Sequence, residues 1–238
     1  MMTLLTLMAL QVDHPLPAAQ RERLARELDE AIAKWSAVLE LDPRNVDAYS
    51  RRGDARFKKG LFKEAVEDYD AMVRLDPSLE KGHWRRGLAL YFAGDAARGA
   101  KQFEAYHAHD DADRENGLWL FFCRAKARDP HAARQGLLRY QKADRDPLPA
   151  VYAVLTGEVK EEDVLPAIES AEREEFEKES RRFYAYLYLG LIRLVDGKTE
   201  AALAHLRRAV ENRWAPGAGY GPAFMWHVAR LEYERIAK

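Results

Sequence analysis

"WRRGLALYFAGDAARGAKQF", residues 84–103, has the composition of a helix but contains three glycines, Gly87, Gly94 and Gly99. A glycine inside a helix costs about 1 kcal/mol relative to alanine, because it loses more backbone freedom on folding. Three such residues in one short stretch indicate that each of them has a structural role.

The glycines recur at a fixed spacing. When the chain is shifted against itself by 34 residues, small, aromatic and proline positions coincide. The coinciding pairs are Gly53 and Gly87, Gly60 and Gly94, Ala65 and Gly99, Tyr69 and Phe103, and Pro43 and Pro77. Such a period is the signature of a repeat protein in which every unit is one supersecondary structure.

Each unit is interpreted as two antiparallel helices. The first helix needs a small residue where the backbone of its neighbour approaches, as at Gly53 and Gly87, and it ends at a glycine that tolerates a left-handed backbone, as at Gly60 and Gly94. The second helix pairs a small residue with an aromatic one four positions later. Only four isoleucines and four threonines occur in the chain, which also disfavours β-sheet.

This pattern resembles the tetratricopeptide repeat. The resemblance implies an all-α fold, an α-solenoid of helix-turn-helix repeats with a C-terminal capping helix. The expected divisions are a signal remnant or hydrophobic cap at 1–12, a degenerate first repeat at 13–45 with one long helix at 18–41, three repeats at 46–147, an irregular acidic helical segment at 148–182, a repeat at 183–216 and the capping helix at 217–238.

The irregular segment is strongly acidic, with ten acids and three bases between Glu158 and Glu179. A solvated helical face is the usual explanation of such a run. An acidic docking patch, or a contact with a basic part of a second copy, is the alternative.

Residues 118–235 resemble the NlpI-like group of bacterial lipoproteins. The stretches that carry the resemblance are "LWL", "LTGEVKEEDVL" and "FYAYLYLG", followed by a final helix with histidine and aromatic residues. The resemblance implies a dimeric, periplasmic adaptor that brings substrates to a protease in cell-wall turnover, with a cytoplasmic location as the alternative. The sequence departs from that group in having no lipobox cysteine near its N-terminus, since Cys123 is its only cysteine.

Several classes of function are not expected. The net charge of −1 gives no overall attraction to nucleic acid, and no stretch reaches the roughly 18 apolar residues of a membrane span. No catalytic motif, cofactor motif or metal-binding motif stands out, so we expect no enzyme and no cofactor. The one competing candidate is the stretch 107–113, where His107, His109 and Asp110 would hold a metal; a linker between helices is the simpler interpretation.

The inner wall of a tetratricopeptide solenoid is built by the first helix of each repeat and commonly binds polypeptides. In the register of this family, the candidate partner-binding residues are Phe57, Lys58, Lys81, Trp84, Arg85, Leu88, Tyr91, Phe92, Leu118, Phe122 and Lys126. Ser50 and Asp54 stand where a carboxylate clamp would need Lys and Asn, so no such clamp is expected. Alternatively, Trp84 and Phe122 pack against the irregular segment and the groove is closed.

The predicted function is therefore that of a non-catalytic adaptor or scaffold with protein or peptide partners. Two alternatives stay open at this point. One is a metal-binding or enzymatic protein that uses 107–113, and the other is a purely structural homo-oligomer, the homodimer included.

Overall fold

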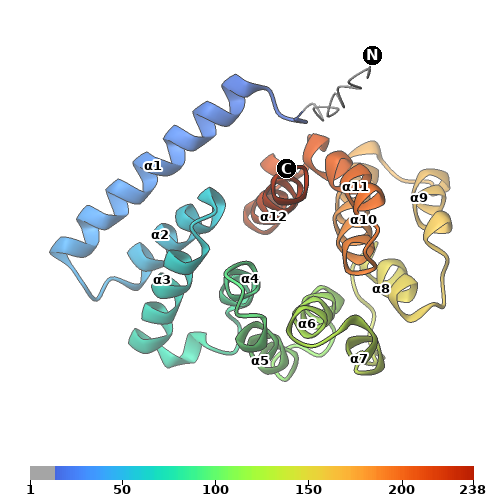
Figure 1. The fold of residues 1–238 in the computed structure, drawn as a ribbon, viewed down its shortest axis with the longest axis horizontal. Coiled ribbons are helices and arrows are strands. Elements are labelled where there is room, and N and C mark those ends of the chain that lie inside the picture. Colours follow the sequence, from blue (N-terminus) through green and yellow to red (C-terminus); the bar gives the residue numbers. More distant parts are fainter. Residues whose placement is uncertain (1–13) are drawn as a thin grey trace, which may run out of the picture.

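The computed structural model describes residues 14–238. These residues form twelve α-helices and two short 3₁₀ helices and contain no β-strand. The helices follow one another around a ring (Figure 1). The expected signal remnant or cap at 1–12 lies outside the described residues. The helices are α1 (Ala18–Leu41), α2 (Val46–Lys59), α3 (Phe62–Leu75), α4 (Trp84–Phe92), α5 (Ala96–His107), α6 (Arg114–Ala127), α7 (Pro130–Gln135), α8 (Leu148–Thr156), α9 (Glu161–Ser170), α10 (Glu175–Val195), α11 (Thr199–Glu211) and α12 (Tyr220–Ile236).

The ends of the first helices of the regular repeats follow the sequence, and a side-chain cap starts α2. Asn45 accepts a hydrogen bond from the Ala48 amide at 2.9 Å and so caps the start of α2. Gly60 at the end of α2 and Gly94 after α4 have φ angles of +88° and +91°, which only glycine adopts readily. The long helix expected at 18–41 is α1, and it packs along α2.

The small residues of the repeat face an aromatic ring. A Cβ atom on Gly53 would lie 2.7 Å from Tyr69 Cε1, and one on Gly87 would lie 2.6 Å from Phe103 Cζ. Both rings belong to the second helix of the same repeat and are almost completely buried. The expectation that a neighbouring backbone requires these glycines is therefore corrected: a tyrosine or phenylalanine ring occupies the place of the missing side chain.

The third repeat is shortened. Its second helix, α7, ends at Gln135, so Leu137 lies in the loop that follows, where a full repeat would continue the helix. Ala133 is buried on α7. The Arg124 guanidinium donates to the Gly136 carbonyl at 2.6 Å, and the Tyr152 hydroxyl donates to the Leu138 carbonyl at 3.0 Å. These contacts hold the chain extended where the repeat pattern predicts more helix.

The acidic segment is partly helical, and some of its acids form ion pairs. It contains α8 and α9, and its last residues, from Glu175, already belong to α10. The Arg182 guanidinium lies 2.6 Å from the Glu169 carboxylate and 2.8 Å from that of Glu179. Glu161 accepts from His205 at 2.9 Å and pairs with Arg193. Part of this negative charge is thus balanced within the same molecule.

The last helix closes the ring. α12 packs on α11, as the next helix of the stack would, and also reaches α2 from the opposite side (Figure 1). The Arg230 guanidinium donates to the Lys58 carbonyl, and Phe224, Val228 and Ala229 are fully buried. The helix expected to cap an open end therefore lies inside the curve, where it forms part of the core.

Candidate functional site

One half of the inner face is filled by α12. The Phe224 ring stacks on Phe57 at a centroid distance of 4.8 Å and meets Trp84 edge-on at 5.1 Å. The ammonium of Lys58 lies over the Phe224 ring, 5.8 Å from its centroid. The aromatic wall that the sequence places on the inner face is present, but a helix of the same chain covers it here.

A polar cluster closes the edge of this filled half. Asp54 accepts hydrogen bonds from the Tyr69 hydroxyl at 2.8 Å and from the Arg85 guanidinium at 2.6 Å, and also from the Tyr220 hydroxyl. Arg85 donates in addition to Ser50 Oγ at 2.9 Å. Side chains of α3, α4 and α12 thus meet at one carboxylate of α2, and Arg85 is engaged within the chain.

The structure divides the predicted partner-binding residues into several groups. Five of them are buried side chains of the core: Phe57, Leu88, Tyr91, Leu118 and Phe122. Phe92 stacks on Phe62 at 5.0 Å, and Phe122 stacks on Tyr188 at 6.4 Å. Phe224 of α12 and Tyr188 of α10 therefore cover part of the wall, and α8, which lies in the segment 148–182, also packs on α6.

The predicted basic residues do not form one group either. The Lys126 ammonium donates to the Tyr91 carbonyl at 2.9 Å, and burial lowers its pKa. Burial likewise lowers the pKa of Lys58. Lys81 is exposed and borders a separate depression together with His83 and His109. Only Trp84 and Leu88 among the predicted residues line the cavity described next.

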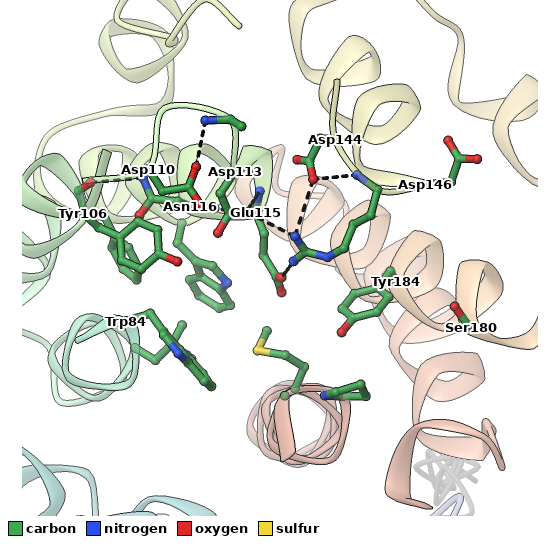
Figure 2. Close-up of a pocket in the computed structure, with 18 of the residues that line it drawn as sticks. Trp84, Tyr106, Asp110, Asp113, Glu115, Asn116, Asp144, Asp146, Ser180 and Tyr184 are labelled. Carbon is green, nitrogen blue, oxygen red and sulfur yellow. Dashed lines mark hydrogen bonds and ion pairs between the residues drawn. The ribbon is translucent and has the colours of Figure 1, made fainter. Parts of the chain in front are cut away.

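The other half of the inner face is open. A cavity of about 770 Å³ lies between α4, α6, α10 and α12 and the loop that precedes α8 (Figure 2). Its aromatic lining includes Trp84, Tyr106, Trp119, Tyr184 and Trp214. Its charged lining comprises Asp110, Asp113, Glu115, Asp144 and Asp146, with Arg145 and Arg181.

A carboxylate network forms one side of this cavity. Asp113 caps α6 by accepting from the amides of Glu115 at 2.9 Å and Asn116 at 3.4 Å. The Arg145 guanidinium pairs with Glu115 and lies 3.6 Å from Asp113 and 3.5 Å from Asp144. One half-exposed arginine therefore holds three acids that come from two separate segments.

A buried chain of hydrogen bonds extends from Glu115 into the core. The Tyr188 hydroxyl donates to the Glu115 carboxylate, and the Trp119 indole donates to the Tyr188 oxygen at 3.1 Å. Burial is the main cause that raises the pKa of Glu115, and it also raises that of Asp113. Burial, with Asp113 and Asp110 nearby, raises the pKa of Tyr106 to about 12.

The stretch 107–113 connects α5 to α6, as its interpretation as a linker predicts. Asp111 pairs with Lys142, Asp110 accepts from the Ala112 amide at 3.0 Å, and Asp113 is a helix cap. Across residues 14–238, no three histidine, cysteine or acidic side chains are grouped so that they could hold a metal. The geometry gives the metal-site alternative no support.

Most residues of the cavity were missed by the sequence analysis. Tyr184, Trp214 and Met225 belong to the C-terminal part of the chain, and Arg145 lies in a loop outside the repeat register. The one available signal was Asp113, whose position before an apolar helix is typical of an N-cap. In the part of the chain that the structure describes, no helix has the length and apolar character needed to cross a membrane.

A family profile supports the repeat assignment over part of the chain. The profile, described as "TPR repeat", matches residues 25–60, which cover about the last two thirds of α1 and all of α2. Among curated proteins, none matches the chain. A solved tetratricopeptide repeat protein from Parabacteroides merdae ATCC 43184 is similar over 92% of this chain and 80% of its own, with 16% identity and a TM-score of 0.49. The described part of the chain is all-α and consists of successive packed helix pairs, of which the profile match covers residues 25–60. Repeats of the matched family generally mediate protein–protein interaction; the NlpI-like grouping finds no support in these matches.

Proposed function

We propose that this protein is a non-catalytic interaction scaffold that binds a segment of a partner polypeptide in the cavity of the open half. The cavity is the observation that carries this proposal. Its volume of about 770 Å³ is in the range of sites that enclose a ligand, and aromatic side chains with a few fixed polar groups are the usual lining of such sites.

The polar groups of the cavity are suited to recognition because they are held in place. Asp113 is fixed by the N-terminus of α6, and Glu115 by Tyr188 and Arg145. A preorganised site loses less conformational freedom when its ligand binds. Since the filled half offers only covered aromatic rings, the open half is where a partner would make contact.

A side chain placed in the cavity tests the proposal. Gly221 lines the cavity near the start of α12, and a Cβ atom there would meet no heavy atom within 4 Å. Gly221→Leu should therefore obstruct the cavity without straining the fold. Gly217→Leu is the matched control, because Gly217 also has open space around it but lies outside the cavity.

Peptides selected from a displayed random library on the native chain provide the measurement. We expect Gly221→Leu to weaken their binding about tenfold or more, a loss of about 1.4 kcal/mol, and Gly217→Leu to leave it unchanged. Selected peptides that bind the Gly221→Leu chain equally well, or a library from which no peptide is enriched, would exclude the cavity as the partner site.

We further propose, from the sequence resemblance over 118–235, that the partner is an envelope protease or its substrate and that the protein acts in the periplasm. Crosslinking and mass spectrometry in the native host should then recover a protease of cell-wall turnover, and recovery of only cytoplasmic partners would contradict this. The expected homodimer also stays a proposal. Sedimentation velocity over a range of concentrations tests it, and a purely structural oligomer would assemble without any bound peptide.

A further inference from the structure

We infer that the cavity takes a lysine or arginine side chain of the partner polypeptide. This inference rests on the proposed binding role of the cavity and adds the chemistry of the recognised group. Five carboxylates and only two guanidinium groups line the cavity. The lining thus has a surplus of negative charge in a partly enclosed space, where electrostatic interactions are stronger than in bulk water.

Neither arginine of the cavity is free for an anionic ligand. Arg145 is shared among Glu115, Asp113 and Asp144. The Arg181 guanidinium donates to the Glu177 carbonyl at 2.9 Å and lies 3.6 Å from the Asp146 carboxylate. Both guanidinium groups therefore already lie against carboxylates, although the Arg181 Nε makes no hydrogen bond, and the surplus charge of the lining is negative.

The Asn116 side chain indicates independently that the ligand carries a hydrogen-bond donor. It lines the cavity, yet its side chain is almost entirely buried, with 3% exposed. Its Nδ2 donates to the Phe103 carbonyl at 3.1 Å, which fixes the orientation of the amide. Its Oδ1 is then left without a hydrogen-bond partner in the described structure. A buried acceptor of this kind is costly unless a donor reaches it.

Lysine and arginine side chains carry only donors, three and five N–H groups respectively, and so match an acceptor beside carboxylates. The aromatic lining also suits a cation, since the face of a tryptophan or tyrosine ring attracts positive charge. In Figure 2, Asp110, Asp113 and Glu115 are grouped on one side of the cavity, and Trp84 lies across it. A long, flexible side chain could pass the rings and place its charged end among the acids.

One helix-capping acid and one acid that accepts from a loop amide allow this charge to be removed with little change in structure. Asp113 caps α6, and Asp110 accepts from the Ala112 amide, so asparagine can keep both hydrogen bonds while it removes both charges. The test variant is Asp110→Asn with Asp113→Asn. The matched control is Asp95→Asn with Asp129→Asn, which changes two N-cap residues outside the cavity by the same charge.

The probes are N-acetyl-lysine-N-methylamide and its arginine and norleucine counterparts. They are titrated into the full chain while the indole NMR signals of Trp84 and Trp214 are followed. We expect saturable shifts with the lysine and arginine probes and none with norleucine. The cavity double variant should bind about tenfold more weakly, because two unit charges close to the ligand are lost, and the control double variant should bind normally. Thermal unfolding verifies that both variants are folded.

Several results would overturn the inference. Equal binding of the norleucine probe, or equal binding by the two double variants, would exclude recognition of a basic side chain. Tighter binding of glycine methylamide would assign the cavity to a chain terminus, and much tighter binding of spermidine would assign it to a free polyamine. Cavity-dependent peptides without any basic residue would refute this inference and leave the scaffold role intact, whereas probe binding without any peptide binding would refute the scaffold role alone.

Discussion

The two halves of the inner face are built from the same repeat helices but meet different neighbours. In the filled half, Phe57 and Phe92 are covered by other aromatic rings, and α12 takes the place of a partner. In the open half, Trp84 and Tyr106 border a cavity whose opposite side is formed by polar groups at the start of α6 and in the loop that precedes α8. Trp84 belongs to both halves. The repeat pattern thus specifies a wall, while distant parts of the chain determine which portion of it stays accessible.

The largest difference in stability between variants of the two halves is expected when Phe224 is substituted. Phe224→Ala removes a fully buried ring from the filled half, and such a change costs about 3–5 kcal/mol in the free energy of unfolding. Urea denaturation followed by circular dichroism measures it. Ser180→Ala, in the lining of the open half, should change stability by about 0.5 kcal/mol or less. A loss below about 1 kcal/mol for Phe224→Ala would show that α12 is not part of the core.

A smaller effect is expected within the wall itself. Gly87→Ala would bring a Cβ atom to 2.6 Å from the buried ring of Phe103 and should destabilise the protein by about 2 kcal/mol through overpacking. Gly82→Ala is the control, because no heavy atom lies within 4 Å of the added carbon. The urea midpoints of the two variants provide the measurement. Equal stability of both variants would contradict the close packing of the Phe103 ring against Gly87.

Acidification should act in opposite directions at His83, beside the wall, and at Glu115, in the open half. Burial, with Arg85 and Arg86 adding, lowers the pKa of His83 to about 3. The unfolded chain therefore takes up a proton near pH 6.5 that the folded chain does not, and stability is lost as the pH falls below that value. Between pH 7 and pH 5 this loss is about 1–2 kcal/mol. His83→Asn should remove it and keep the cap, since the His83 ring now accepts from the Arg86 amide at 3.2 Å.

Glu115 contributes to the pH dependence of stability with the opposite sign. Its pKa is raised, chiefly by burial, so the folded chain takes up a proton at a higher pH than the unfolded chain. This carboxyl group therefore stabilises the fold as the pH falls through its raised pKa, and Glu115→Gln should abolish that gain. Urea midpoints for both variants at several pH values provide the test. Changes of the same sign in the two variants would refute the assigned protonation states.

The smallest effect is expected at Lys81, which lies outside both halves. Lys81→Ala should change stability by about 0.5 kcal/mol or less and leave peptide binding unchanged, because Lys81 is exposed and borders a different depression. Fluorescence polarisation with a selected peptide measures the second quantity. A marked loss of affinity would revive the carboxylate clamp that the residues at positions 50 and 54 argue against.

The sequence predicts those parts of the fold that depend on contacts between residues close together in the chain. The hairpins at 46–107 follow from Gly60, Gly94 and the pairs Gly53–Tyr69 and Gly87–Phe103, all within one repeat. The cavity could not be predicted in this way. Glu115 meets Tyr188 across a separation of 73 residues and Arg145 across 30, and neither partner follows the repeat period.

The position of α12 shows the same limit. Its amphipathic pattern predicted a helix correctly, but the pattern does not indicate which apolar surface the helix covers. That choice depends on the curvature accumulated over all preceding helices, which brings Arg230 to Lys58 across 172 residues. The predicted list of partner residues therefore identified a real aromatic wall and mistook its buried portion for an accessible one.

The contact between Arg230 and Lys58 bears on how the protein is made. α12 is synthesised after all the helices that it contacts. The growing chain therefore exists for a time as an open spiral with its aromatic interior uncovered. Such an intermediate is prone to aggregate or to engage chaperones. A messenger truncated before the codon for residue 220 would leave the chain in that state permanently, and quality-control proteases would be expected to remove it.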